Sequence, residues 1–333
     1  MNSRASMKTG RVFIIALALG MVTAPVSADA QPPAAQLPRI GILMQTASPP
    51  PPTPHVEWLL QGLRELGYED GRNVAFEIRY GANDAQRLAE LATELVRLRV
   101  AVIATVGDLA TRSAQQATRT IPIVAGVGDP VETGFTASLA RPGGNITGVA
   151  ILAGELAPKR LELLKEVVPK LRRVAVLRDP VTSERQLKVA EAGVRALKLE
   201  AQIVEARAPS EFERAFEAVV RGRADALLML VSPMFLRSHD ALIGLAAKNR
   251  IPAMYTYRVF AERGGLMAYG PALLDVYRSA AGLIDKILKG AKPAELPWQQ
   301  PTKFELVINL KTAKALGLTI PQSVLVRADH VIQ

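Results

Sequence analysis

The sequence predicts an α/β protein with two similar lobes, each built around a parallel sheet with helices on both faces. Short apolar runs alternate with amphipathic helical stretches along the chain, which is the pattern of such sheets. The order strand-helix-strand-helix-strand occurs twice, from Arg39 and again from Arg173. The length of 333 residues exceeds the roughly 250–300 residues at which single cores stop growing. Two units of this size are too few for a repeat array, so we expect two lobes.

The front of the chain has the pattern of a secretory signal. Three basic residues precede an apolar run at residues 12–22, and Ala-Asp-Ala ends at Ala30. A membrane anchor is the alternative, but the run is shorter than the roughly 18 residues of a span and Pro25 follows it. We expect a signal peptide at 1–30, cleaved near Ala30, then a Pro- and Ala-rich tether at 31–38. The mature protein is therefore predicted to be soluble and periplasmic.

The first lobe follows this signal. Strands are expected at 39–45, 73–80, 100–106 and 122–127, and a strand that crosses between the lobes at 145–152. Thr53-Pro54 is a typical helix start, and Gly67 can end that helix in a left-handed conformation. Asp84 is expected to cap the second helix, and a third helix begins near Leu109.

The second lobe repeats this order. Strands are expected at 173–177, 200–206, 224–231, 252–257 and 266–269. Ser183 with Gln186, and Ser210 with Glu213, have the spacing of a capping box at a helix start. Another helix is expected to begin at Ser232-Pro233. The tail contains a strand-like run at 304–308 and a short helix at 311–316.

These elements give a domain organisation. Lobe 1 is expected at 39–148, with residues 272–296 packing back on it. Lobe 2 is expected at 149–271. Residues 297–333 are expected to form a C-terminal segment that crosses between the lobes.

Composition and motifs exclude several classes of function. There are no cysteines, so disulfides and thiolate chemistry are excluded. The net charge is +10, but basic residues are scattered among acids, which favours a solvated surface over nucleic-acid binding. Gly126-Val127-Gly128 lacks the third glycine of a dinucleotide site, because position 131 is Val. Neither a G-x-S-x-G elbow nor a phosphate-binding loop occurs, and the three histidines lack metal-ligand spacing. We expect no catalysis, no cofactor and no metal; a His-centred triad is left open by sequence.

Candidate binding residues lie at the ends of the strands. In open parallel sheets ligands bind beyond the carboxyl ends of the strands, and two facing lobes would aim these ends at one cleft. Lobe 1 contributes Gln45, Thr46, Thr105, Gly107 and Asp129. Gly107 permits close approach of a ligand to the backbone, and the N–H groups of the following helix suit a carboxylate. Asp129 suits an ammonium group, with a simple turn as the alternative. Thr105 has helix capping as its alternative, and Asp108 is expected to be a helix cap.

Lobe 2 contributes a second set at its strand ends. These residues are Arg178, Asp179, Ser232, Tyr255 and Tyr269, with Tyr257 between the last two. Arg178 can clamp a carboxylate through two hydrogen bonds, with an ion pair to Asp179 or to the facing lobe as the alternative. Ser232 is equally a helix cap. The tyrosines offer flat faces to an aromatic or aliphatic ligand, although aromatic residues in strands are more often core.

Several strings in the chain resemble one family across residues 38–332. They are RIGIL at 39–43, GLRELGY at 62–68, DPV at 129–131, ARPGGNITG at 140–148 and PTKFELVINLKTA at 301–313. The family is the ABC transporter substrate-binding proteins of the tryptophan/tyrosine type. The resemblance implies a type I periplasmic-binding-protein fold, with two Rossmann-like lobes joined by a multi-strand hinge, and solute capture for an ABC importer.

We therefore expect a monomeric extracytoplasmic protein that reversibly binds a small amino-acid-like or carboxylate solute between its lobes. Its expected partners are an ABC permease and its ATPase, and it would contact the membrane only through the permease. A periplasmic sensor or chemoreceptor subunit is the first alternative. A small-molecule hydrolase is another, and a transcription regulator would need a DNA-binding module where this chain has a signal.

Overall fold

The computed structural model describes residues 37–47 and 54–333. The expected signal peptide, tether residues 31–36 and Thr53 lie outside the described residues. Leu37–Gln333 form one compact unit that contains two separate β-sheets. None of the helices in these described ranges is both long and apolar enough to cross a bilayer.

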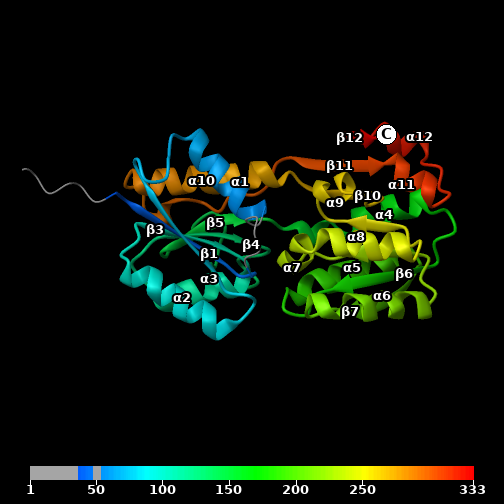
Figure 1. The fold of residues 1–333 in the computed structure, drawn as a ribbon, viewed down its shortest axis with the longest axis horizontal. Helices are drawn as coiled ribbons and strands as arrows, with labels where there is room; N and C mark the ends of the chain where they lie inside the picture. Colours follow the sequence, from blue (N-terminus) through cyan, green and yellow to red (C-terminus); the bar gives the residue numbers. More distant parts are fainter. Residues whose placement is uncertain (1–36, 48–53) are drawn as a thin grey trace, which may run out of the picture. The chain divides into compact units, whose positions relative to one another are not determined.

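The first sheet has five strands in the order β2-β1-β3-β4-β5, and all neighbouring strands are parallel (Figure 1). The strands are β1 (Arg39–Met44), β2 (Ala75–Tyr80), β3 (Val102–Val106), β4 (Ile123–Val127) and β5 (Ile146–Ala150). Because parallel strands are covered on both faces, the three central strands carry almost only buried residues.

Two pairs of helices cover this sheet. One core contains residues of α1 (Pro54–Glu65) and α10 (Leu273–Leu288), which lie side by side in Figure 1. The other core contains residues of α2 (Ala85–Arg97) and α3 (Asp108–Ala117). Helix α10 therefore belongs to the first lobe, although it follows the strands of the second lobe in sequence.

The second sheet has seven strands in the order β12-β11-β10-β9-β8-β6-β7. The strands are β6 (Arg173–Arg178), β7 (Glu200–Glu205), β8 (Ala226–Met229), β9 (Ala253–Tyr255), β10 (Met267–Pro271), β11 (Phe304–Asn309) and β12 (His330–Ile332). Only the β10–β11 pair is antiparallel within this sheet. The prediction of two Rossmann-like lobes with parallel sheets is confirmed.

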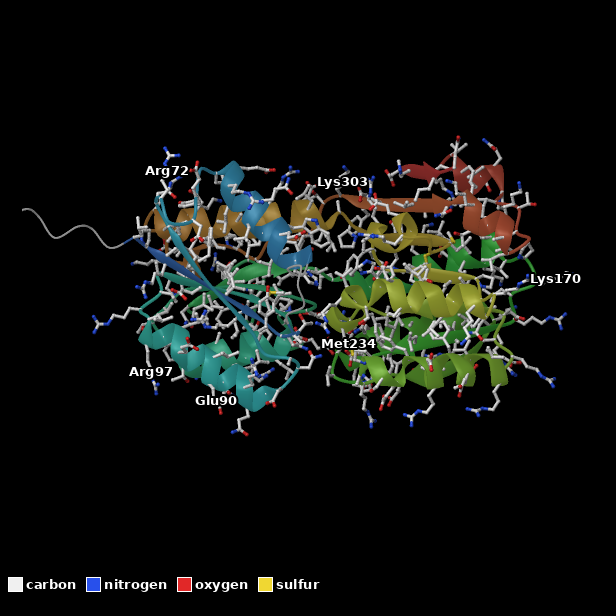
Figure 2. The ribbon with its side chains drawn as sticks, viewed as in Figure 1. Arg72, Glu90, Arg97, Lys170, Met234 and Lys303 are labelled. Atoms are coloured by element: carbon white, nitrogen blue, oxygen red, sulfur yellow. The ribbon has the colours of Figure 1, made fainter. Side chains whose placement is uncertain are left out.

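Helices also cover both faces of the second sheet. One core contains residues of α4, α5, α11 and α12, and the other contains residues of α6, α7, α8 and α9. Their bounds are α4 (Ala157–Val167), α5 (Glu184–Ala196), α6 (Phe212–Arg221), α7 (Pro233–Arg237), α8 (His239–Lys248), α9 (Arg258–Glu262), α11 (Leu310–Ala315) and α12 (Gln322–Leu325). Charged side chains such as Glu90, Arg97 and Lys170 point away from the ribbon into solvent (Figure 2).

Three connections link the two sheets. The first runs from β5 through a 3-10 turn (Ala153–Leu156) into α4, and the second runs from β10 into α10. The third leaves α10 through a 3-10 turn (Pro293–Glu295), pairs alongside β5 and enters β11. Arg160 of α4 ties the first two together, because its Nε donates to Tyr269 O at 2.6 Å and its Nη1 to Ala153 O at 2.9 Å.

Local signals at the helix ends were partly correct. Asp84 caps α2 by accepting the Arg87 N–H at 3.0 Å, and Gly67 follows α1 with φ of 88°. The two predicted capping boxes are wrong. Ser183 does cap α5, but Gln186 turns inward and bonds the backbone of Val231. At Ser210 a 3-10 turn precedes α6, which has no side-chain cap.

Candidate functional site

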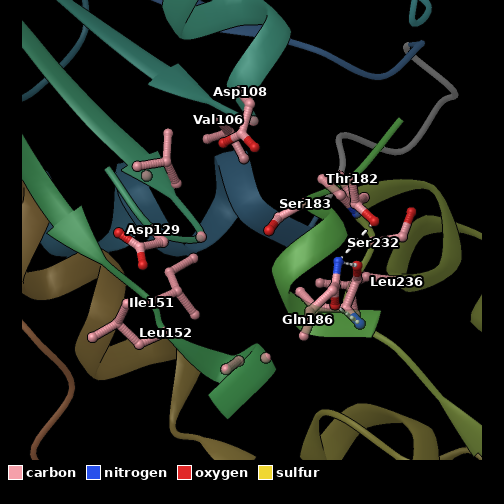
Figure 3. Close-up of a pocket in the computed structure, with 18 of the residues that line it drawn as sticks. Val106, Asp108, Asp129, Ile151, Leu152, Thr182, Ser183, Gln186, Ser232 and Leu236 are labelled. Atoms are coloured by element: carbon pink, nitrogen blue, oxygen red, sulfur yellow. Dashed lines mark hydrogen bonds between the residues drawn. The ribbon is translucent and has the colours of Figure 1, made fainter. Parts of the chain in front are cut away.

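A cleft of about 910 Å³, part of it open to solvent, lies between the two lobes. Its walls come from the segments that follow β3, β4 and β5 in the first lobe and β6, β8 and β9 in the second. Figure 3 shows Asp108 and Asp129 on one side of this cleft and Ser183 and Ser232 on the other. The cleft thus stands at the carboxyl ends of the parallel strands, where open α/β sheets bind ligands.

Gln45 and Gly107 line the cleft on the side of the first lobe. Gly107 has φ of 97°, a conformation that favours glycine, and precedes the first turn of α3. A Cβ at this position would lie 2.4 Å from Gln45 Oε1. Gln45 Oε1 accepts the backbone N–H of Leu109 at 3.1 Å. The absence of a side chain at Gly107 therefore leaves room for Gln45, which accepts a backbone hydrogen bond in the first turn of α3.

Asp108 is the first residue of α3 and lines the cleft with its half-buried carboxylate. Burial raises its pKa to about 6, and the nearby charges of Glu132 and Asp129 act in the same direction. A hydrogen bond from the Gly128 backbone and the positive charge of Arg112 oppose this rise. A carboxyl group with a pKa near neutrality inside a cleft is typical of functional sites.

Asp129 follows β4 and is largely occupied with its own turn. Its Oδ1 accepts the backbone N–H groups of Val131 at 3.0 Å and Glu132 at 3.1 Å. Its Oδ2 lies 3.8 Å from Arg185 Nη1 of the second lobe. The carboxylate lines the cleft, but one oxygen is committed to local structure.

Ser232 and Asp179 form a buried pair in the second lobe. Ser232 Oγ donates to Asp179 Oδ2 at 2.7 Å and accepts the backbone N–H of Met234 at 3.0 Å, so it caps α7. Burial raises the pKa of Asp179, while the hydrogen bond from Ser232 and the charge of Arg178 oppose the rise. Ser232 faces the cleft, and Asp179 lies outside the lining residues.

Three residues connect the lobes across the cleft, and we call them the cross-cleft latch: Glu132 of the first lobe with Ser183 and Arg185 of the second. Ser183 Oγ donates to Glu132 Oε2 at 2.6 Å, and the backbone N–H of Arg185 donates to Glu132 Oε1 at 3.3 Å. The Arg185 guanidinium donates to Glu155 Oε1 at 2.8 Å. A further contact joins Arg237 Nη1 to Ala47 O at 2.9 Å. The lobes are therefore held together at the edge of the cleft.

The remaining lining of the cleft, which we call the apolar wall, is aromatic and aliphatic, and its residues come from both lobes. His55, Tyr257 and Tyr277 line it, and so do the aliphatic residues Val106, Val127, Ile151, Leu152, Val181, Val231, Leu236 and Leu273. His55 Nδ1 hydrogen-bonds Tyr277 Oη, and burial lowers the pKa of His55 to about 4. The imidazole is therefore neutral near pH 7, and this wall carries no charge.

The structure brings four of the ten predicted site residues to the cleft, namely Gln45, Gly107, Asp129 and Ser232. The other six lie outside its lining. Thr46 is buried, and Thr105 bonds Thr111 Oγ1 at 2.7 Å beneath α3. Tyr255 is stacked on Phe260 in the core, with 4.9 Å between ring centroids.

Arg178 and Tyr269 also point elsewhere. Arg178 is buried and its Nη2 lies 2.6 Å from Glu184 Oε1, while its Nε lies 3.9 Å from Glu205 Oε1. Tyr269 lies beside Phe304 at the β10–β11 pair. Sequence reasoning did not find the latch or the aromatic pair His55–Tyr277. The only signal for Tyr277 was the expectation that residues 272–296 pack back on lobe 1, which does not say which helix face meets the cleft.

No group of three or more acidic or histidine side chains within residues 37–47 and 54–333 is arranged to hold a metal ion. What the site offers is a set of hydrogen-bonding and charged groups among aromatic and aliphatic side chains. Such a concave, mostly apolar site with a few polar groups is typical of small-molecule binding.

Two lobes of this topology, with a cleft at the carboxyl ends of their strands, define the type I periplasmic-binding-protein fold. The chain belongs to the family of ABC transporter substrate binding proteins, whose model matches residues 43–332. A curated relative, a tyrosine-binding protein of Clostridioides difficile (strain R20291), is 27% identical over 262 residues, which are 78% of this chain and 75% of the relative.

Solved structures share the same fold. One is an ABC domain in complex with L-Trp from Streptococcus pneumonia, with TM-score 0.79 and 24% identity, covering 89% of this chain and 100% of that chain. Another is the ligand-free, open structure of a substrate binding protein with adhesive properties from Clostridium difficile, with TM-score 0.61, 21% identity and the same coverage. A conserved domain protein from Vibrio cholerae has TM-score 0.81 at 24% identity, again covering 89% of this chain and 100% of that chain.

Proposed function

We propose that this chain is the extracytoplasmic solute-binding component of an ABC importer and that it reversibly binds a small amino-acid-like solute in the cleft between its lobes. The observation that carries the proposal is a cleft lining that combines polar groups, among them Gln45, Asp108 and Ser232, with the aromatic side chains of Tyr257 and Tyr277. An amino acid has the matching halves, since it joins a charged head to a side chain.

The relatives support an aromatic or large apolar side chain. A tyrosine-binding protein and a protein in complex with L-Trp are among the similar proteins. In this chain the apolar wall holds two tyrosines and an uncharged His55 together with aliphatic side chains. Aromatic rings of a ligand pack favourably against such faces.

The proposed transport role follows from closure of the lobes. We propose that the three connections between the sheets act as a hinge and that the lobe limits are those expected from sequence, 39–148 with 272–296 and 149–271. A ligand shifts the balance between open and closed forms only by its preference for the closed form. A permease with its ATPase would bind the closed form of this periplasmic monomer. The solute would be released to the permease without chemical change.

A ligand screen tests this function. The protein, purified after export, is tested by thermal shift against the twenty L-amino acids and a set of small organic acids, and hits are titrated by calorimetry. Ligand at 100 times its Kd adds about 2.7 kcal/mol of stability, which raises the melting temperature by several degrees. We expect one amino acid or a small group to do so. If none does while a chromogenic ester or phosphate is turned over, the hydrolase alternative replaces this proposal.

A further inference from the structure

The cleft carries more negative than positive charge. Its lining includes the carboxylates of Asp108, Asp129, Glu132 and Glu155, and Arg185 is the one Lys or Arg side chain among the described lining residues. Arg185 is already bound to Glu155 at 2.8 Å and lies 3.8 Å from Asp129. An added anion would therefore enter a negative environment without an unpaired cation to meet it.

Two of the helices that begin at the cleft, α3 and α5, are already supplied with carboxylates at their starts. On the first-lobe side, Asp108 occupies the first turn of α3, and the Leu109 N–H is taken by Gln45. On the second-lobe side, Glu132 accepts both the Ser183 hydroxyl and the Arg185 backbone N–H at the start of α5. Helix starts favour anions, but here protein carboxylates satisfy that preference.

Asp108 differs from the other three carboxylates in its partners. Asp129 accepts two backbone N–H groups, Glu132 accepts the Ser183 hydroxyl, and Glu155 is paired with Arg185. Asp108 makes no salt bridge within the part of the chain that the structure describes. A half-buried carboxylate without a salt-bridge partner is costly, and a cation that reaches it offsets that cost.

The charged groups that face Asp108 set the expected dependence on pH. Arg112 on its own helix favours the ionised form, whereas Asp129 and Glu132 on the loop after β4 oppose it, and burial outweighs them all. The result is a pKa of about 6 in the unliganded cleft. A bound cation would stabilise the ionised form and lower that pKa.

We infer that Asp108 binds the ammonium group of the ligand, so that the cleft accepts solutes that carry a cationic amine and rejects solutes that carry only a carboxylate. The inference rests on the proposed function and narrows its ligand class. It also reverses the roles predicted from the sequence, which assigned the ammonium group to Asp129 and helix capping to Asp108.

Three forms of one ligand test this inference by calorimetry. The first probes are L-tyrosine, its decarboxylated form tyramine, and its deaminated form 3-(4-hydroxyphenyl)propionate. If the screen favours another amino acid, its three corresponding forms are used. We expect the amino acid and the amine to bind the unaltered protein at pH 7.5, and the deaminated acid to bind at least 100-fold more weakly.

Two charge-removing variants locate the effect. Asp108→Asn is expected to weaken both amine-bearing probes by about 30- to 100-fold, whereas Asp129→Asn, which keeps the oxygen that its turn needs, is expected to change affinity by less than about threefold. The affinity of the unaltered protein for the amine is expected to rise with pH through about 6, and that of Asp108→Asn to be flat. Melting temperatures of both variants show that they are folded.

The outcomes separate the inference from the proposed function. Binding by Asp108→Asn within threefold of the unaltered protein overturns the inference and leaves the function standing. Equal affinity for the deaminated acid and the amino acid does the same. Failure of the unaltered protein to bind any member of the screen overturns the proposed function, and the inference with it.

Discussion

Ser183 at the start of α5 donates a 2.6 Å hydrogen bond to Glu132 on the other side of the cleft. The same carboxylate accepts the Arg185 backbone N–H, so one first-lobe side chain accepts two hydrogen bonds at the N-terminus of a second-lobe helix. Contacts of this kind exist only when the lobes are together. In the proposed hinge motion, the cross-cleft latch therefore adds its free energy to the closed form alone.

Removing the latch should weaken ligand binding, because the closed form loses contacts between the lobes. For Glu132→Ala we expect a three- to tenfold rise in Kd, because a hydrogen bond to a charged group contributes about 1.5–3 kcal/mol and part of it is recovered by water. Calorimetry measures the Kd, and small-angle scattering measures the fraction of open molecules. Lys188→Ala is the control, since Lys188 is an exposed residue of α5 about one turn after Arg185. Equal affinities of Glu132→Ala and the control would contradict the role of the latch.

Gly107 should tolerate no side chain. Gly107→Ala places a Cβ 2.4 Å from Gln45 Oε1 and forces a left-handed φ on alanine, so Gln45 must leave its bond to Leu109. We expect a loss of about 1–3 kcal/mol in the free energy of unfolding and a lower affinity for the ligand. Urea denaturation measures the first and calorimetry the second.

Gly244→Ala is the matched control for Gly107. Gly244 lies within α8, and a Cβ there would meet nothing within 4 Å. Alanine is the better helix former, so this variant should be more stable by about 0.5–1 kcal/mol. A Gly107→Ala protein as stable as Gly244→Ala would show that Gln45 yields without cost.

The sequence predicted the two-lobed fold because apolar periodicity and helix starts are local signals. It also predicted where the strands end, and Gln45, Gly107 and Ser232 indeed reach the cleft from those ends. It did not predict where a side chain at a strand end points. Arg178 turns to Glu184, and Tyr255 stacks in the core, because tertiary partners decide such orientations.

Asp108 should make the unliganded protein less stable above pH 6. Its folded pKa of about 6 exceeds the usual value of 3.8, so its contribution to stability is complete below pH 3.8 and is lost as pH rises through 6. Asp108→Asn does not ionise, so at pH 7.5 it should be more stable than the unaltered protein by on the order of 1–2 kcal/mol. Urea denaturation at pH 4.5 and 7.5 measures this difference. A difference that does not grow with pH would argue against a strained carboxylate.

His55 should act in the opposite direction over an overlapping range of pH. Its folded pKa of about 4 is below the usual value of 6.5, because the ring is buried in the apolar wall. Its contribution to stability is therefore present above pH 6.5 and is lost as pH falls towards 4, since the unfolded chain binds the proton first. The loss should amount to roughly 2–3 kcal/mol.

A glutamine at position 55 separates the two effects. Glutamine keeps a polar group that can reach Tyr277, but it does not titrate, so His55→Gln should hold its stability between pH 6.5 and 4.5 better than the unaltered protein. Combining His55→Gln with Asp108→Asn should flatten the profile further, because the two cleft groups with strongly shifted pKa values are then absent. Urea midpoints at pH 4.5, 5.5 and 6.5 provide the measurement. Parallel profiles of His55→Gln and the unaltered protein would mean that the imidazole takes up its proton in the folded state as readily as in water.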